Sequence, residues 1–425
     1  MGNGVILAHL STVISALKVK FDRNNPTKIR ALKVNIICQI AQILCYYHVD
    51  STRYSFRKQY RPRTLHKRDH VWNEILNKES IYNNDEFLSV FRVTRSTFKR
   101  IVALVKDNPV LQGQNSEKQS KHFVPEIHLL ATFKFFGAEG NQGGSKRLRE
   151  NLGMGKGSIS NYVDRGVKAI LSLRDQCFFW PSEEERLEIS SRIKSRYFFK
   201  NCVGIIDGTH LGLSTRPENC GEEYFTRKGQ YAISALIIVD DKKRIRHASV
   251  GWPGSVHDNR IWSNSRIVRN PRDYFSPNEY TIGDSAFTNS NIMVTSYKRA
   301  SGQAVLPAGQ SWFNDVLNVP RSGVENTIGI WKGRFPWLRN MRMRIRNRQS
   351  MVKIITYVYA TIILHNLCVK TPYQNDWLID NGDSDSDSED GCATDDGLNV
   401  TINPDNENST RRDSVHNYLY RKLLS

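Results

Sequence analysis

The sequence predicts an α/β protein in which an all-helical region precedes a domain that mixes strands and helices. Apolar residues recur at helical spacing from about residue 72 to residue 198. From Val203–Ile206 onward the pattern changes to short, strongly β-forming runs, of which Tyr231–Val239 and Ile245–Val250 form a predicted hairpin. We divide the chain accordingly into N-terminal helices with a basic arm (1–70), a helical domain (71–199), a mixed domain (200–370) and an acidic, mostly disordered tail (371–425).

The charge of the chain is strongly positive and unevenly distributed. Its formal net charge is +19, but residues 371–425 hold 12 acidic and 4 basic residues, a net of −8. The remaining 370 residues therefore carry +27. A body this basic repels itself, and nucleic acid is the simplest partner that offsets the repulsion; an anionic membrane surface is the weaker alternative. The Asp- and Ser-rich tail cannot bury a core, so we expect it to be disordered.

Cysteine usage and hydropathy favour a reduced compartment and no membrane. The seven cysteines are scattered and form no C-x-x-C pair, which argues against a disulfide framework and a zinc ribbon. The stretch Val5–Phe21 contains charged residues and does not look like a signal peptide. Polar residues interrupt Ala31–Tyr47, which predicts an amphipathic helix rather than a membrane span.

The helical region contains a pattern suggestive of a helix-turn-helix. A short helix is predicted at Ser145–Leu152, a turn at Gly153–Lys156 and a longer helix at Ser158–Leu173. If they are exposed, Lys156 and Arg165 would face DNA. An ordinary helical hairpin explains the same pattern, and both interpretations stay open.

The remaining elements follow from local composition. After Asp207, Leu211–Ser214 is expected to pair back as a separate short strand. Residues 300–318 contain Gly, Pro and Asn and predict a loop. Met351–Val369 predicts a long apolar helix that closes the domain, and Val415–Leu424 predicts a short terminal helix.

Three acidic residues lie where they can converge. Asp207 directly follows the first apolar run, and Asp284 follows the predicted strand Tyr280–Ile282. Glu325 lies on a helix predicted over Arg321–Trp331. Carboxylates hold Mg²⁺, and two such ions about 4 Å apart can clamp the attacking and leaving oxygens of a phosphoryl displacement. Spacing alone is weak support, because 42 acidic residues offer many sets of three and Asp207 alone reads more simply as a turn former.

Six motifs surround these acids in a fixed order. They are Asp207–His210 (DGTH), Tyr224–Gly229 (YFTRKG), Val250–Asp258 (VGWPGSVHD), Gly283–Ser285 (GDS), Val324–Phe335 (VENTIGIWKGRF) and Leu364–Asn366 (LHN). The series resembles the PIF/Harbinger transposases and the nucleases domesticated from them, over roughly residues 85–370. The sequence departs from the family pattern at Ala286–Phe287, where Gly-Tyr is usual, and at Asn326, where Arg is frequent.

The resemblance implies an RNase H-like catalytic domain with an Asp-Asp-Glu triad. Asp207, Asp284 and Glu325 match the family's metal ligands, which implies a divalent metal, Mg²⁺ or Mn²⁺, as two ions. His257 and Asp258 match the family's His-Asp pair. Asp258 could support the ligands and His257 could contact phosphate, but a capped helix start explains both residues equally well.

Clustered basic residues are predicted to contact DNA phosphates. Lys332, Arg334 and Arg339 belong to an Arg-rich segment that follows Glu325, and Arg227 and Lys228 lie near the first strand pair. The aromatic residues between them are better read as core.

These observations predict a metal-dependent DNA endonuclease and strand transferase, either a transposase or a nuclease descended from one. A catalytically silent DNA-binding protein and an RNase H-like enzyme acting on RNA are the alternatives. We expect double-stranded DNA as substrate, a homo-oligomer on DNA, no membrane, and a nuclear location with a cytoplasmic pool. The resemblance also implies a Myb-like DNA-binding partner protein.

Overall fold

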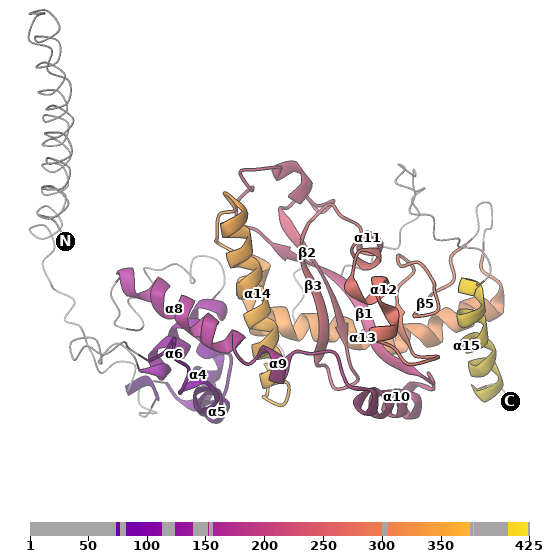
Figure 1. Ribbon diagram of the computed structural model, residues 1–425, viewed down its shortest axis with the longest axis horizontal. Helices are drawn as coiled ribbons and strands as arrows, with labels where there is room; N and C mark the ends of the chain where they lie inside the picture. The colour runs from indigo at the N-terminus through magenta and orange to yellow at the C-terminus, as the bar shows by residue number, and fades with distance from the viewer. Residues whose placement is uncertain are drawn as a thin grey trace, which may run out of the picture. The chain divides into compact units, whose positions relative to one another are not determined.

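The centre of the structure is a five-stranded mixed sheet with strand order β3-β2-β1-β4-β5 (Figure 1). The computed structural model describes residues 74–76, 82–112, 124–138, 152, 156–299, 305–374, 377 and 407–423. The strands are β1 (Cys202–Gly212), β2 (Ala232–Val239), β3 (Ile245–Pro253), β4 (Tyr280–Gly283) and β5 (Met293–Thr295). β1, β2 and β3 pair antiparallel, whereas β4 and β5 run parallel to β1. The mixed α/β class predicted from the sequence is confirmed.

The central strand β1 is longer than the sequence predicts. Asp207 lies in its middle, so both a strand ending at Asp207 and a separate strand at Leu211–Ser214 are wrong. The reason is that β2 pairs with β1 continuously from Ile205 to Gly212. The parallel neighbour β4 pairs with β1 only as far as Ile205. Asp207 therefore follows the end of the parallel pairing while it remains inside the strand.

Helices cover both faces of the sheet, and the alternation of side chains along the strands decides which residues meet which helices. On one face, residues such as Ile205 and Ile237 pack against α13 (Ala308–Arg334) and α14 (Arg348–Cys368). On the other face, residues such as Ile206 and Ile238 pack against α11 (Asp258–Ser263) and α12 (Arg266–Arg269) (Figure 1).

Helix α13 begins well inside the loop predicted at residues 300–318, so this prediction is wrong from Ala308 onward. Phe313, Leu317 and Val324 recur at helical spacing and are fully buried, which outweighs the turn-forming composition. Pro320 is buried inside the helix. The side chain of Asn314 also has a structural use, because it bonds both the backbone N–H and the carbonyl of Tyr297 at 2.8 and 3.0 Å.

The described residues before β1 form helices only. These are α4 (Asn84–Phe91), α5 (Arg95–Val105), α6 (Pro125–Phe136), α8 (Lys156–Leu171), α9 (Arg174–Cys177) and α10 (Glu183–Tyr197). Thr94 caps α5 by accepting a hydrogen bond from the Thr97 N–H. α8 corresponds to the second helix of the predicted helix-turn-helix, and it begins at Lys156, which was predicted as the last residue of the turn. Of the first helix and the rest of the turn only Leu152 is among the described residues, and the prediction for residues 1–70 lies outside them.

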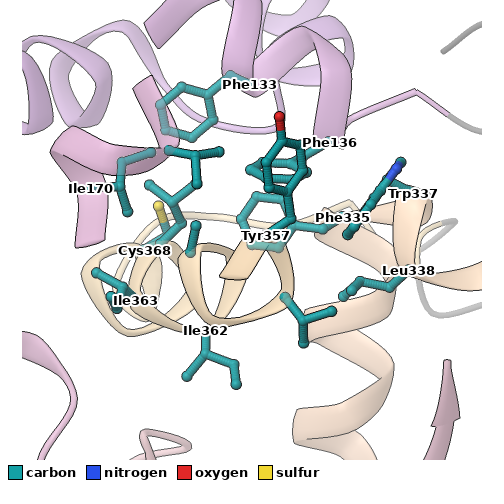
Figure 2. Close-up of a cluster of buried hydrophobic side chains, with 14 of the residues drawn as sticks. Phe133, Phe136, Ile170, Phe335, Trp337, Leu338, Tyr357, Ile362, Ile363 and Cys368 are labelled. Carbon is teal, nitrogen blue, oxygen red and sulfur yellow. The ribbon is translucent and has the colours of Figure 1, made fainter. Parts of the chain in front are cut away.

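The helices share a hydrophobic cluster with the sheet and its covering helices. Figure 2 shows Phe133 and Phe136 of α6 and Ile170 of α8 against Tyr357 of α14 and Trp337. Trp337 belongs to a short 3-10 helix, η5 (Pro336–Arg339). Polar contacts add to this packing. Asp164 of α8 accepts from the Tyr357 hydroxyl and pairs with Lys353 Nζ at 2.8 Å. The helical part is therefore held on the mixed domain through α14.

The C-terminal helix α15 (Glu407–Leu423) is longer than the predicted Val415–Leu424. Val415 and Leu419 are buried against Phe313 and Leu317 of α13. The acidic stretch 383–390 lies outside the described residues, so the expected disorder stays a prediction.

α14 is, within the described ranges, the one helix long and apolar enough to cross a membrane by length and composition. Its apolar side chains have protein partners, since Ile354, Val358 and Ile362 are fully buried in the cluster described above.

Candidate active site

The first two acids of the predicted triad follow the last paired residues of neighbouring parallel strands. Ile205 of β1 pairs with Ile282 of β4, and Asp207 and Asp284 each follow two residues later. Asp207 remains inside β1 and, like Ile205, is directed to the face covered by α13, whereas Asp284 comes directly after the end of β4 at Gly283. Both acids therefore lie where the parallel pairing of β1 and β4 ends, and the charge of Asp284 acts on Asp207.

Local backbone contacts hold each aspartate. Asp207 Oδ1 accepts a hydrogen bond from the Gly208 N–H at 3.0 Å. Asp284 Oδ1 accepts from the Ala286 N–H at 2.9 Å, which is an Asx turn that ends β4. Both side chains are half-buried.

The third acid, Glu325, comes from α13. Val324 and Ile328 turn inward to the sheet, which leaves Glu325 on the exposed side of the helix. Its carboxylate lies 3.6 Å from the guanidinium of Arg321, one helical turn earlier. The sequence analysis missed Arg321, although its i,i+4 spacing from a candidate ligand is a recognisable signal for an ion pair.

The electrostatics show that these charged groups surround Asp207. Burial raises the pKa of Asp207 well above its ordinary range, and the Arg321 guanidinium opposes this shift. The negative charges of Asp284, Asp258 and Glu325 raise the pKa further. Within the described ranges, however, no three His, Cys, Asp or Glu side chains are gathered closely enough to hold an ion. The charges of Asp284, Asp258 and Glu325 thus act on Asp207, but these carboxylates are not gathered closely enough to form a metal site.

Asp258 reaches this environment from the opposite face of β1. A Cβ built on Gly208 would lie 1.9 Å from Asp258 Oδ2 and 2.2 Å from its Cγ, so the carboxylate occupies the space that a side chain at position 208 would need. Asn259, the next residue of α11, bonds both the hydroxyl and the backbone N–H of Thr288, at 3.0 and 2.9 Å. These contacts fix the start of α11 between β1 and the loop that follows Asp284.

His257 forms the N-cap position of α11 without capping it through its side chain. The ring is exposed, and Arg227 Nη2 donates to His257 Nε2 at 3.4 Å. Two motifs far apart in the sequence, YFTRKG and VGWPGSVHD, therefore meet at the edge of the acidic cluster. Arg227 and Lys228 are both exposed there.

Of the three basic residues after Glu325 that were predicted to contact DNA, two are buried and one is half-buried. Lys332 and Arg334 are 6% and 1% exposed, so a DNA phosphate cannot reach either, and the prediction of phosphate contact is wrong for both. Arg334 instead donates to the carbonyls of Arg92 and Thr371 at 2.7 and 3.0 Å. Arg339 is half-buried and donates to the Trp377 carbonyl at 3.0 Å.

The helical candidates remain predictions. Arg165 is half-buried on α8, and the side chain of Lys156 lies outside the described residues. The exposed basic side chains of the Arg-rich segment are Arg342, Arg344, Arg346 and Arg348.

The motif Leu364–Asn366 has a structural use. Asn366 accepts from the Ile245 N–H and donates to the carbonyls of Ile245 and Cys177, each at 2.8 Å. His365 Nε2 lies 2.9 Å from the Lys243 carbonyl. The end of α14 thereby holds the β2–β3 hairpin, and with it the sheet that carries Asp207. Likewise His210 Nε2 lies 3.1 Å from the Gly254 carbonyl, as expected for a residue that fixes a loop.

Comparisons with known proteins agree with this geometry. The family model described as DDE superfamily endonuclease matches residues 206–366. "Protein ALP1-like" of Arabidopsis thaliana is 23% identical over 301 residues, which cover 67% of this chain and 70% of the relative. "Putative nuclease HARBI1" is 20% identical over 257 residues in Rattus norvegicus (60% and 70% covered) and 21% identical over 291 residues in Homo sapiens (67% and 78% covered). No solved structure matches the chain significantly.

The matched segment runs from the middle of β1 to the end of α14 and so contains every element that positions Asp207, Asp284 and Glu325. The resemblance stated from the six motifs is confirmed: this chain carries a DDE superfamily endonuclease domain and is related to the Harbinger transposase-derived proteins.

Proposed function

We propose that the chain is a metal-dependent DNA endonuclease and strand transferase with an RNase H-like catalytic domain. The observation that carries the proposal is that Asp207 and Asp284 each follow, by two residues, the last paired residues of two parallel strands, with Glu325 on the helix that covers this face. The mixed five-stranded sheet and the match to DDE superfamily endonucleases support the RNase H-like assignment.

The donor set fits a hard divalent cation. Asp207, Asp284 and Glu325 offer only carboxylate oxygens, which Mg²⁺ and Mn²⁺ prefer. Burial is the main cause of the raised pKa of Asp207, and the charges of Asp284, Asp258 and Glu325 add to it; a divalent cation beside the carboxylate would favour its ionised form. When bound there as two ions, the metal would activate the attacking water or 3′-hydroxyl and stabilise the leaving oxyanion.

The other residues of the site prepare it for a polyanionic substrate. Arg321 holds Glu325 by an ion pair and lowers the repulsion among the carboxylates. Asp258 contributes negative charge from behind β1 and supports the loop carrying Asp284 through its neighbour Asn259. Arg227 and Lys228 are exposed, and Arg227 contacts His257, so both can receive DNA phosphates next to the site.

A comparison of matched variants tests this function. Purified full-length chain with Mg²⁺ or Mn²⁺ is expected to nick duplex DNA, and Asp207→Asn and Glu325→Gln to reduce the rate at least 100-fold because each removes a ligand. The controls Asp273→Asn and Glu188→Gln change the same groups at exposed positions away from the site. A second readout is stability: Mn²⁺ should raise the melting temperature of the wild type and not that of Asp207→Asn.

The same experiment separates the rival functions. A catalytically silent DNA-binding protein would bind duplex DNA, but its cleavage would not exceed that of the two triad variants. An RNase H-like enzyme acting on RNA would cut an RNA–DNA hybrid in preference to duplex DNA. Either result would overturn the proposal. Nuclear location, assembly on DNA as a homo-oligomer and a Myb-like partner belong to the same proposal and follow from a transposase-like DNA substrate.

A further inference from the structure

The turn between η3 (Gly221–Tyr224) and β2 presents an exposed aromatic side chain next to two exposed cations. Phe225 is 48% exposed, and Arg227 and Lys228 follow it at the tip. Single exposed hydrophobic side chains occur at several places in the described residues, but Phe225 is followed within three positions by two exposed cations. An exposed aromatic ring beside cations is the combination with which proteins bind unpaired bases and phosphates.

The turn is built rigidly from its own backbone. Phe225 and Tyr231 form an isolated antiparallel bridge, and the Thr226 N–H donates to the Gln230 carbonyl at 2.9 Å. Gly229 takes the left-handed conformation, with φ of +74°, and closes the turn through its N–H to the Thr226 carbonyl at 3.0 Å. Thr226 is itself buried, at 3% exposure. The backbone at Phe225 is therefore fixed by the hydrogen bonds of the turn.

A second set of contacts fixes the turn relative to the acidic cluster. A Cβ on Gly254 would lie 2.8 Å from the Thr226 side chain and 2.9 Å from the Tyr224 carbonyl, so the YFTRKG turn packs directly on the segment that leads to His257. Arg227 closes the contact by donating to His257 at 3.4 Å. The nearby acid Glu222 is paired with Arg216, whereas Glu223 of the same 3-10 helix is exposed, so the turn carries both signs of charge, with Arg227 and Lys228 as its cations.

The register of the sheet gives the separation of the turn from the site. β2 begins opposite Gly212, five residues along β1 from Asp207, which corresponds to about 17 Å at 3.3 Å per residue. Stacked nucleotides rise about 3.4 Å each, so a strand that ran along β1 from a scissile phosphate at Asp207 would reach the start of β2 after about five nucleotides.

We propose that the Phe225–Tyr231 turn binds DNA flanking the cut, with Arg227 and Lys228 on the backbone and Phe225 stacked on an unpaired base. This inference rests on the proposed function. Bases inside a duplex are already stacked on their neighbours, so an exposed side chain can stack only on a base that is unpaired or turned out. The ring of Tyr231, 5.2 Å from that of Phe225 and inclined at 61°, supports Phe225 from one side. The turn therefore favours DNA ends or distorted flanks over uniform duplex.

Binding measurements on the full chain without divalent metal test this proposal apart from cleavage. Two fluorescent DNAs of the same sequence are compared by anisotropy, one fully paired and one with a central unpaired bubble. Wild type should prefer the bubble. Phe225→Leu, which keeps an apolar side chain over Tyr231, should lose about tenfold in affinity for the bubble and little for the duplex, because stacking is lost. Phe225→Trp should retain the preference, and the matched control Phe198→Ala, at an exposed aromatic after α10, should behave as wild type.

Substitution of Arg227 tests the predicted phosphate contacts independently of the stacking. Arg227→Gln should weaken binding to both DNAs alike and lower the salt dependence of the affinity by about one phosphate contact. Equal affinities of wild type and Phe225→Leu for the bubble DNA would overturn the inference, while loss of cleavage in Asp207→Asn would still uphold the proposed function. If the wild type bound neither DNA, the inference and the proposed function would both be overturned.

Discussion

The arginines of this chain show how burial decides the use of a charged residue. Arg227 is exposed beside the acidic cluster, Arg321 forms an ion pair with a candidate ligand, and Arg334 is buried among backbone carbonyls. All three lie in or beside motifs that the sequence analysis treated as DNA-contacting or catalytic. A guanidinium suits each role because it offers five donors and always carries charge, so residue type alone cannot separate the roles.

Arg334→Ala is expected to destabilise the protein without a specific effect on DNA. The substitution leaves the carbonyls of Arg92 and Thr371 without their donor and removes the cation lying 5.4 Å over the Trp377 ring. We expect a loss of about 3 kcal/mol in the free energy of unfolding, measured by urea denaturation. The control Arg344→Ala, at an exposed position, should change stability by less than about 0.5 kcal/mol. A stable Arg334→Ala variant with weakened DNA binding would restore the original interpretation of phosphate contact.

The candidate site could be predicted from the sequence only in part. The prediction of Asp207, Asp284 and Glu325 depends on ordered motifs, which reduce many sets of three acids to one, whereas spacing alone leaves Asp207 as a turn former. Burial of Arg334 could not be predicted, because its hydrogen-bond partners, the carbonyls of Arg92 and Thr371, lie far from it along the chain.

At the scale of elements, the site depends on the close contact of β1 with α11. The Asp258 carboxylate occupies the space beside Gly208, since a Cβ at position 208 would overlap it. Gly208 thus allows α11 to approach β1. Asn259 of α11 in turn hydrogen-bonds Thr288 in the loop after Asp284.

Gly208→Ala should therefore displace α11. A methyl group 1.9 Å from Asp258 Oδ2 cannot be accommodated without a shift, and we expect a loss of about 2 kcal/mol of stability together with reduced cleavage. The double variant Gly208→Ala/Asp258→Ala removes the overlap and should recover part of the stability. Gly323→Ala on α13, where a Cβ would meet nothing within 4 Å, should be neutral or stabilising by up to about 1 kcal/mol. The melting temperatures of the wild type and of these three variants, measured by thermal denaturation, test the predicted stability changes. Equal melting temperatures for Gly208→Ala and the wild type would contradict the prediction.

The bounds of helices and strands with a strong local sequence pattern were predicted closely. The bounds of elements that depend on contacts with residues far away in the chain were not. The hairpin expected at Tyr231–Val239 and Ile245–Val250 corresponds to β2 and β3, because apolar β-forming runs and the turn between them determine it. α13 was missed over its first half, because Pro320 and the polar residues before it favour a loop locally. Its apolar side chains are buried only because the sheet and α15 are present.

At the scale of the whole molecule, α14 connects the helices that precede β1 with the mixed sheet. It packs on the sheet, on α6 and α8, and holds the β2–β3 hairpin through His365 and Asn366. The sequence predicted this helix and its closing position, but its contacts with α6 and α8 depend on residues about 200 positions earlier in the chain, such as Asp164. Local periodicity contains no information on such contacts. Changes in the ionisation of groups buried at these junctions should therefore act on the stability of the whole domain.

The half-buried His247 and the buried His365 make the protein sensitive to acid. Burial lowers the pKa of His247 on β3 to about 4. Burial likewise lowers the pKa of His365 to about 4, against the opposing hydrogen bond to the Lys243 carbonyl. In the unfolded chain both groups return to about 6.5. The unfolded state then binds more protons between these values, so stability is retained above pH 6.5 and is lost as the pH falls toward 4.

Urea denaturation between pH 7.5 and 4.5 measures this loss. Each histidine should contribute up to about 1.4 kcal/mol per pH unit within the window, and His247→Gln should remove about half of the histidine contribution to the slope. Asp207 acts in the opposite direction, since its raised pKa means that protonation relieves the folded state as the pH falls. Combining His247→Gln with Asp207→Asn separates the two effects. A slope unchanged by His247→Gln would show that His247 is protonated alike in the folded and unfolded chains.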